Sequence, residues 1–249
     1  MAVHIIIPAR YASTRFPGKP LALIHGKPMI QHVYEAACTS MADHVAVATD
    51  DERIAECVRG FGGQAVMTSS TLPSGTDRCG EAARQLGLNT DDVVINVQGD
   101  EPFITGDIIN LLIHQFDNPD TQIATLTSVI TNPAEINDPN KVKVVFDKKH
   151  KALYFSRHTI PYLRNPEQFT VKYFKHIGIY GYRFGVLQEL IRLPESDLEK
   201  SEKLEQLRWI ENGYSIFVAE CEYEGVGIDT PEDLNQVTGY RVQGTEVKN

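Results

Sequence analysis

The sequence predicts an α/β fold, with a Rossmann-like, mostly parallel sheet flanked by helices and a smaller lobe of mixed or antiparallel strands. Strand and helix patterns alternate through the first half of the chain, which is typical of βαβ units. Strand patterns follow one another with fewer helices between them in the second half. A length of 249 residues allows one large core, and no linker divides the chain, so we expect a single globular unit over residues 1–249.

The elements of the first half follow in regular order. Three consecutive isoleucines before Pro8 predict a buried strand at residues 4–9. Pro28, a residue favoured in the first helical turn, opens a helix expected at residues 28–41. The remaining elements are strands at 44–49, 65–68 and 92–97 and helices at 51–60, 76–86 and 105–116. Right-handed crossovers would assemble these units into a doubly wound sheet.

The second half predicts a different arrangement. Strands are expected at residues 122–130, 142–147, 152–155, 176–182 and 214–219. Helices are expected at 184–192 and 198–213, and a last one starts near Thr230. Thr230, Pro231 and Asp233 form a capping pattern for that last helix.

Composition excludes several classes of protein. The chain has 24 basic and 33 acidic residues, and its net charge of −9 argues against nucleic-acid binding. Its apolar runs are far shorter than the ~18 residues of a membrane span, and we identify no signal peptide, so a cytoplasmic location is expected. The cysteines have no CxxC spacing, which argues against zinc, and we expect all four to be small buried hydrophobes: Cys38, Cys57, Cys79 and Cys221.

Positive charge is concentrated at the start of the chain. The first acidic residue is Glu35, and four cations precede it: Arg10, Arg15, Lys19 and Lys27. The first 34 residues therefore carry +4, and the remaining 215 carry −13. A surface loop normally mixes signs, so this segment predicts a site for one small anionic ligand. An incidental cluster of solvated charges is the alternative.

Three of these cations lie in the loop after the first strand, at residues 8–20. Ligands of doubly wound sheets bind outside the carboxyl ends of the strands, where this loop begins. The loop is not a P-loop, because Ser13 stands where that motif needs glycine and Pro20 where it needs serine or threonine. Phosphate recognition would therefore come from arginine and lysine side chains.

Two aspartates are candidate metal ligands. Asp100 follows the strand at 92–97 in the sequence QGDEP, and Asp229 precedes the last helix. A carboxylate at the carboxyl end of a strand is well placed for Mg²⁺ that carries phosphates. Each could equally be a turn residue. Asp50 and Asp51 form a rival acidic pair, which we interpret as capping and first-turn residues of the helix at 51–60.

Several segments resemble the cytidylyltransferases that activate 3-deoxy-manno-octulosonate (Kdo), and are less similar to the acylneuraminate cytidylyltransferases. The first is IIPARYASTRFPGKPL at residues 6–21. The others are SGTDR at 74–78, VQGDEP at 97–102, ALYFSR at 152–157, KHIGIYGYR at 175–183, EQLRW at 205–209 and GIDTPEDL at 227–234. They occur in order along nearly the whole chain.

The resemblance implies that CTP and Kdo give CMP-Kdo and pyrophosphate, for lipopolysaccharide synthesis, in a homodimeric enzyme. It implies Mg²⁺ held by Asp100 and Asp229. The expected catalytic residues are Arg10, Arg15, Lys19 and Asp100. The expected nucleotide contacts are Ala9, Arg10, Arg15, Lys19, Ser74, Gly75, Arg78 and Gln98.

The resemblance also suggests sugar contacts: Gln98, Arg157, His176, Tyr180, Glu205 and Gln206. Strand alternation places His176 and Tyr180 on one face, while Glu205 and Gln206 flank the apolar stripe of their predicted helix. Residues 1–120 would form the nucleotide-binding half and 121–225 the sugar-binding and dimerisation lobe. Residues 226–243 would bring Asp229, the second metal ligand, back to the nucleotide-binding half and would end in the C-terminal helix.

Two alternatives remain from the sequence. One is a cytidylyltransferase for a related sugar acid, 8-amino-Kdo or a sialic acid, since analogues that differ by one group are separated by few contacts. The other is a nucleotide-binding regulatory module without catalysis, which we expect to lack the cations or the aspartates that this chain retains.

Overall fold

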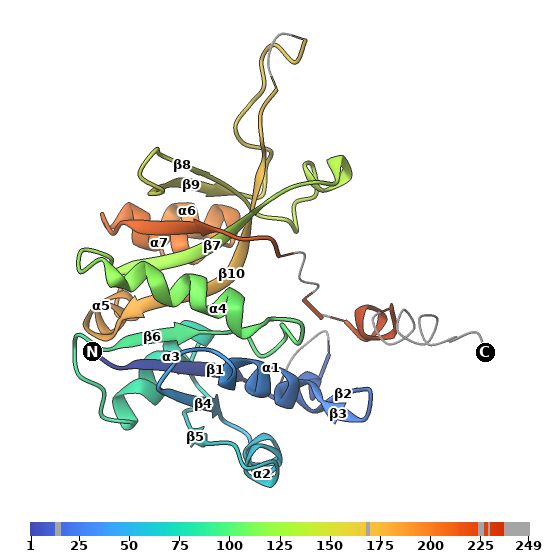
Figure 1. The fold of residues 1–249 in the computed structure, drawn as a ribbon, viewed down its shortest axis with the longest axis vertical. Coiled ribbons are helices and arrows are strands. Elements are labelled where there is room, and N and C mark those ends of the chain that lie inside the picture. The colour runs from blue at the N-terminus through green and yellow to red at the C-terminus, as the bar shows by residue number, and fades with distance from the viewer. Residues whose placement is uncertain (13–15, 168–169, 224–226, 229, 237–249) are drawn as a thin grey trace. The chain divides into compact units, whose positions relative to one another are not determined.

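The computed structural model describes residues 1–12, 16–167, 170–223, 227–228 and 230–236 (Figure 1). The chain forms two compact units. The N-terminal unit contains Ala2–Leu88, Asn96–Ile109 and Gly225–Asn249, and the central unit contains Met1, Asn89–Ile95 and Asn110–Glu224. Within the described residues, no helix combines the length and the apolar character needed to cross a membrane.

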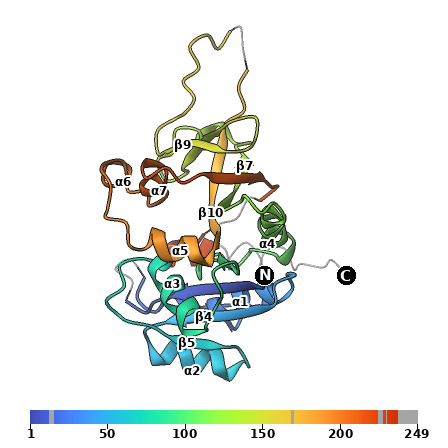
Figure 2. The same ribbon diagram turned by 90° about the vertical axis from the view of Figure 1, so that its left-hand side faces the viewer.

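The N-terminal unit is built on parallel strands β1 (Val3–Ala9), β4 (His44–Thr49) and β5 (Ala65–Met67). Ile5, Ile6 and Ile7 are fully buried, which explains why an apolar run of this kind forms a central strand. The helices that connect and cover these strands are α1 (Met29–Cys38), α2 (Glu52–Gly60) and α3 (Gly75–Gln85) (Figures 1 and 2). The predicted βαβ organisation is confirmed here.

Three short elements after β1 were not predicted from the periodicity of the sequence. They are a 3₁₀ helix η1 (Lys19–Leu21) and a small hairpin of β2 (Leu23–Ile24) and β3 (Lys27–Pro28). Gly26 at the hairpin turn has a φ of 80°, a conformation that glycine adopts at low cost. Two-residue strands bury too few side chains to leave a pattern in the sequence.

The central unit carries the mixed and antiparallel strands. Strand β7 (Ile123–Val129) pairs antiparallel with β10 (Phe174–Arg183) and parallel with β11 (Ile216–Glu220). Strands β8 (Lys143–Phe146) and β9 (Ala152–Ser156) form an antiparallel pair beside β10. The fold class and the change of character in the second half are both confirmed.

The remaining elements complete the chain. They are β6 (Val93–Asn96), α4 (Gly106–Ile113), η2 (His114–Asp117), η3 (Pro133–Glu135) and α5 (Phe184–Leu190). Residues 231–236 form the last described helix. Its predicted capping pattern is confirmed, because the Thr230 amide donates to Asp233 Oδ2 at 2.9 Å and the Asp233 amide donates to Thr230 Oγ1 at 3.2 Å.

Two expectations were wrong. The helix expected at 198–213 is two helices, α6 (Asp197–Glu202) and α7 (Gln206–Glu211), because Lys203 ends α6 in the left-handed region with a φ of 53°. The cysteines are not all buried: Cys79 is enclosed, whereas Cys38, the last residue of α1, is exposed.

Strand β10 has an irregular register that preserves its two faces. Ile177 is opposite Leu126, but Tyr180 is opposite Thr125, so β10 gains two residues relative to β7. A shift of two residues keeps side-chain alternation in phase, whereas a shift of one would exchange the faces. His176 and Tyr180 therefore share a face, as predicted, and their rings are 5.2 Å apart.

Substitution of Gly181 by alanine should destabilise the central unit. The added Cβ would lie 2.9 Å from Phe116 Cζ and 3.0 Å from Ile95 Cδ1, and Phe116 is itself buried. We expect a loss of about 1–3 kcal/mol in the free energy of unfolding, measured by urea denaturation. Gly178→Ala is the matched control on the same strand, because among the described residues, its chain neighbours excepted, no atom lies within 4 Å of a Cβ at this position. Equal stabilities for the two variants would contradict this packing argument.

Candidate active site

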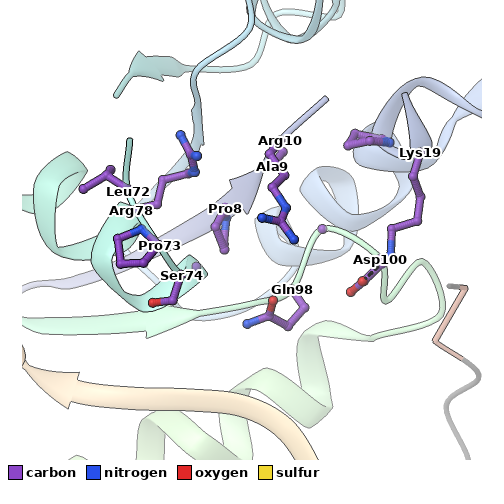
Figure 3. Close-up of a pocket in the computed structure, with 13 residues that line it drawn as sticks. Pro8, Ala9, Arg10, Lys19, Leu72, Pro73, Ser74, Arg78, Gln98 and Asp100 are labelled. Carbon is purple, nitrogen blue, oxygen red and sulfur yellow. Dashed lines mark hydrogen bonds and ion pairs between the residues drawn. The ribbon is translucent and has the colours of Figure 1, made fainter. Parts of the chain in front are cut away.

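A pocket of about 240 Å³ lies at the carboxyl end of β1, within the N-terminal unit (Figure 3). Three chain segments line it: the loop after β1, the start of α3 and the loop after β6. The lining residues are Pro8, Ala9, Arg10, Lys19, Pro20, Leu72, Pro73, Ser74, Gly75, Arg78, Gln98, Gly99 and Asp100. The position agrees with the general rule for ligand sites in open α/β sheets.

Two glycines allow these segments to approach one another. A Cβ on Gly99 would lie 3.0 Å from the carbonyl oxygen of Pro8, and a Cβ on Gly75 would lie 3.2 Å from the Pro8 ring. Both distances are tighter than ordinary contact, so larger residues would push the segments apart. The pocket therefore depends on backbone that closes tightly around Pro8.

Lys19 and Asp100 form an ion pair inside the pocket. Lys19 Nζ lies 2.5 Å from Asp100 Oδ2, although 81 positions separate the residues in the sequence (Figure 3). Their side chains are only 14% and 32% exposed, so water screens the pair weakly. Lys19 is the first residue of η1, which follows Gly18 in the left-handed region with a φ of 72°. A cation and a carboxylate are thus placed together where an anion and its counter-ion could bind.

The chain returns to this pocket near its end. The Ile228 amide donates to the carbonyl oxygen of Asp100 at 3.1 Å, and the buried Ile228 side chain packs with Ile24 and Met29. Asp229, the predicted second metal ligand, lies outside the described residues, as does Arg15. Within the described part of the chain, no group of three or more His, Cys, Asp or Glu residues is arranged to hold a metal ion.

Arg78 is buried at the start of α3 rather than exposed on the helix surface. Only 4% of its surface is accessible, and Nη1 donates to Thr68 Oγ1 at 2.6 Å. Nη2 lies 3.4 Å from Asp50 Oδ2. Asp50 therefore neutralises Arg78, and Asp51 caps α2 by accepting from the Arg53 amide at 3.0 Å. The helix-capping interpretation is confirmed for Asp51, but it is wrong for Asp50, whose carboxylate pairs with Arg78 instead of capping α2.

The other predicted nucleotide contacts lie around the same pocket. Ala9 is the last residue of β1 and Arg10 follows it, and Ser74 caps α3 by accepting from the Asp77 amide at 3.1 Å. Gln98 Nε2 donates to Asn96 Oδ1 at 3.1 Å, which orients its carbonyl oxygen away from that bond. Of the eight predicted nucleotide contacts, the structure brings all except Arg15 to one cavity.

The central unit holds a second group of predicted residues. The His176 ring contacts Phe155 and Tyr180, and Tyr180 meets the Trp209 ring edge-on at 5.1 Å. His176 Nε2 lies 3.0 Å from Thr125 Oγ1. Trp209 and Thr125 were not singled out in the sequence, although Trp209 ends the EQLRW segment.

Burial perturbs the titration of this cluster. Removal of the imidazole from water lowers the pKa of His176 to about 3, so the ring is neutral at physiological pH. Burial, with the Glu205 carboxylate nearby, raises the pKa of Tyr180 well above its usual value. The cluster therefore presents neutral hydrogen-bonding groups.

Two buried polar atoms of the cluster lack a hydrogen-bond partner among the described residues: Tyr180 Oη and Gln206 Nε2. Such atoms are rare in folded proteins and are suited to hydrogen-bond a polar ligand. Gln206 is 5% exposed on α7, so it is more deeply enclosed than the predicted helix suggested. Glu205 precedes it as the N-cap residue and remains partly exposed.

Arg157 has a structural role in this conformation. Its Nε donates to the Glu202 carbonyl at 2.7 Å, and its Nη atoms donate to the carbonyls of Pro139 and Lys203. The bonds to Glu202 and Lys203 satisfy carbonyls at the end of α6. A sugar contact by Arg157 stays a prediction.

The geometry agrees with a nucleotidyltransferase, and sequence comparison identifies the class. The chain belongs to the cytidylyltransferase family, which matches residues 4–217. The 3-deoxy-manno-octulosonate cytidylyltransferase of Parabacteroides distasonis is 51% identical over 244 residues, covering 94% of this chain and 96% of that protein. The 8-amino-3,8-dideoxy-manno-octulosonate cytidylyltransferase of Shewanella sp. (strain ANA-3) is 50% identical over 239 residues, covering 95% and 97%.

Solved structures agree with this assignment. CMP:2-keto-3-deoxy-manno-octonic acid synthetase complexed with CTP superposes with a TM-score of 0.91 and 46% identity, covering 98% of this chain and all of that one. A cytidylyltransferase from Leptospira borgpetersenii has a TM-score of 0.63 at 17% identity, covering 96% of this chain and 85% of that one, and shares the fold alone.

The neutral His176 should make stability fall in acid. Its folded pKa of about 3 lies below the ordinary value near 6.5, so between these values the unfolded state binds a proton that the folded state does not. The contribution of the neutral His176 to the free energy of unfolding is therefore complete above pH 6.5 and is lost as the pH falls toward 3. We expect the difference in unfolding free energy between the unsubstituted protein and His176→Gln to change by roughly 3 kcal/mol between pH 6.5 and 4.

The control for this pH series is His114→Gln, which removes an exposed imidazole of the same unit. Urea unfolding at each pH supplies the free energies. His114→Gln should follow the pH dependence of the unsubstituted protein. If the unfolding free energy of His176→Gln changed with pH in parallel with that of the unsubstituted protein, the low pKa of His176 would be contradicted.

Proposed function

We propose that this enzyme transfers CMP from CTP to Kdo and releases pyrophosphate. The observation that carries the proposal is near-full-length identity of about 50% to Kdo cytidylyltransferases of three bacteria: Parabacteroides distasonis, Porphyromonas gingivalis and Bacteroides thetaiotaomicron. The structural neighbour that was solved with CTP supports the choice of nucleotide.

The pocket of the N-terminal unit would hold CTP. The start of α3 lines the pocket through Ser74 and Gly75, where the positive end of the helix would face the edge of the base, and Arg78 adds guanidinium donors held in place by Thr68 and Asp50. Cytosine presents two adjacent acceptors, its carbonyl oxygen and ring nitrogen, whereas uracil carries a proton on that nitrogen. A side chain with donors only therefore favours cytosine.

The opposite end of the pocket would hold the triphosphate. Lys19 lies there beside Asp100, and Arg10 lines the same cavity. Arginine forks match phosphate oxygens, and lysine contributes a compact positive charge. We assign Arg10 to the α-phosphate region, and Lys19 with Arg15 to the β- and γ-phosphates.

Mg²⁺ is the cofactor we propose, held by Asp100 and Asp229. The donor set fits, because Mg²⁺ prefers one or two carboxylates together with substrate phosphates. The bond from the Ile228 amide to the main-chain carbonyl of Asp100 brings the residue before Asp229 to the Asp100 loop and supports the pairing. When bound, the ion supplies charge neutralisation for the triphosphate. Lys19 would exchange its contact with Asp100 for a phosphate oxygen as the nucleotide enters.

The reaction needs positioning more than covalent help from the protein. The anomeric hydroxyl of Kdo attacks the α-phosphorus in line, an oxygen–phosphorus bond forms, and the bond to the β-phosphate breaks. Pyrophosphate leaves, and the hydroxyl proton passes to water. Arg10 and Lys19 stabilise the charge that spreads over the phosphates, which is the main requirement in phosphoryl transfer.

The aromatic cluster of the central unit would bind the sugar acid. Tyr180 Oη and Gln206 Nε2 are the buried polar atoms available for its hydroxyl groups, and the neutral His176 adds a third polar group. Glu205, Gln98 and Arg157 stay predictions as further sugar contacts. For Arg157, binding the Kdo carboxylate would require new bonds besides those to the three carbonyls.

A related sugar acid is the second candidate. The 8-amino relatives are as similar to this chain as the Kdo relatives, at 50% identity over 239 residues. Competition between Kdo, its 8-amino analogue and a sialic acid at equal concentration would decide. A non-catalytic module is disfavoured, because Arg10, Lys19 and Asp100 all face one cavity.

The cellular setting follows from the substrates. We propose a cytoplasmic enzyme, since CTP is available there, that supplies activated sugar for lipopolysaccharide. Assembly as a homodimer stays a prediction. The exposed side chains of Leu153 and Tyr162, at 56% and 84%, are apolar surface of the central unit that would suit a second copy.

The test of the proposed function is pyrophosphate release by the purified enzyme. Release should require CTP, Kdo and Mg²⁺ together, and CMP-Kdo should appear in equal amount. No release from the folded enzyme with any of the three sugar acids would contradict the proposal.

Lys19→Ala and Asp100→Asn should each lower kcat about 100-fold at saturating substrates, because each removes a charge contact of roughly 3 kcal/mol in the transition state. Lys27→Ala is the matched control: Lys27 belongs to the same cationic segment, but it pairs with Glu35 and does not line the pocket. Thermal unfolding verifies that each variant is folded. Near-normal turnover in both pocket variants would refute their roles.

Gln206→Leu should raise the KM for Kdo about tenfold and leave the KM for CTP within twofold. One lost hydrogen bond to a sugar hydroxyl accounts for a change of this size. The KM for CTP in the same preparation is the internal control. An equal rise in both constants would indicate general misfolding, and no rise in either would remove Gln206 from the sugar site.

A further inference from the structure

Arg53, on the first turn of α2, stacks on the ring of Tyr11 in the loop after β1. The guanidinium carbon lies 3.3 Å from the ring centroid, which is a close cation–π contact. Both residues belong to the N-terminal unit, and neither lines the pocket. The proposed mechanism leaves this contact without a role.

The Arg53 guanidinium is held in place by contacts other than the one with the Tyr11 ring. Its Nε and Nη2 donate to the two carboxylate oxygens of Asp51 at 2.9 and 2.6 Å, a bidentate pair. The same carboxylate caps α2 through the Arg53 amide. The guanidinium therefore has a defined orientation although its side chain is 58% exposed.

Tyr11 in turn closes the loop that leads to Lys19. The Gly18 amide donates to the Tyr11 carbonyl at 2.9 Å, so the backbone on the two sides of residues 12–17 is joined. The Tyr11 ring lies against Gly18: a Cβ added there would be 3.1 Å from two ring carbons and 3.2 Å from Oη. Lys19 follows directly and begins η1.

We propose that Arg53 and Tyr11 are positioning residues, whose stack fixes the closed loop so that Lys19 faces the triphosphate end of the pocket. This inference rests on the proposed function. The chain of contacts runs from the α2 cap through Arg53 and the Tyr11 ring to Gly18. Loss of the stack leaves the charges present but lets Gly18 and Lys19 adopt more conformations, and the free energy needed to order Lys19 again on binding lowers the affinity for the triphosphate.

The position of the stack predicts which part of the nucleotide is affected. The proposed function places Lys19 at the triphosphate end of the pocket and assigns the base and the first phosphate to Arg10, Ser74 and Arg78, which lie outside residues 11–18. Loss of the stack should therefore weaken the binding of CTP and leave the binding of CMP unchanged. A general structural defect would weaken both nucleotides alike.

The experiment measures the Kd of CTP and of CMP by calorimetry, without sugar, for the full chain carrying Arg53→Ala. We expect the Kd of CTP to rise three- to tenfold and the Kd of CMP to stay within twofold. Arg59→Ala is the matched control, an arginine near the end of α2 that is 50% exposed and pairs with Glu52. Tyr11→Phe keeps the ring and should bind both nucleotides normally, whereas Tyr11→Leu should behave like Arg53→Ala.

Several outcomes would overturn the inference. They are unchanged CTP binding in Arg53→Ala, equal loss of CTP and CMP, or a Tyr11→Phe variant as weak as Tyr11→Leu. In turnover assays the positioning role predicts a higher KM for CTP with kcat within twofold. Failure of the unsubstituted enzyme to release pyrophosphate would overturn the proposed function instead, and the binding measurements would still decide the role of the stack.

Discussion

The ion pair between Lys19 and Asp100 is the constraint on which the candidate active site depends. It joins two loops that are distant in the sequence, and each must be placed by its own local geometry. Gly18 starts the turn that carries Lys19, and Gly99 lets the backbone before Asp100 approach Pro8. The pair also keeps each charge neutralised in a partly buried place before a ligand arrives, so the site can be charged without destabilising the fold.

The two units would bind their proposed ligands by different physical means. The N-terminal unit concentrates formal charge, which suits a polyanion. The central unit encloses neutral polar atoms among aromatic rings, which suits hydroxyl groups. His176 illustrates the second strategy, because its surroundings keep the imidazole neutral and fixed against Thr125. A sugar acid activated by a nucleotide needs both kinds of surface.

Much of the fold and part of the site could be predicted from the sequence, for identifiable reasons. Periodicity reports burial, so the isoleucine strand β1 and the alternation in β10 were both predictable. The cluster of cations near the start of the chain indicated the pocket, because the loop after β1 must begin at the carboxyl end of a parallel strand, where ligands of such sheets bind. Periodicity does not report backbone conformation, and the left-handed Lys203 that separates α6 from α7 was therefore missed. The burial of Gln206 and the structural bonds of Arg157 arise from tertiary neighbours, which no local pattern records.

The hydrogen bond from Ile228 to Asp100 has a consequence for the order in which the protein matures. On the ribosome, the whole central unit, through Glu224, is synthesised before Ile228 emerges. Until then the apolar cluster of Ile24 and Met29 lacks its third member, and the Asp100 loop lacks its last backbone partner. A nascent chain can therefore form its sheets early, yet the Asp100 loop gains its bond to Ile228 only after the whole central unit has been synthesised.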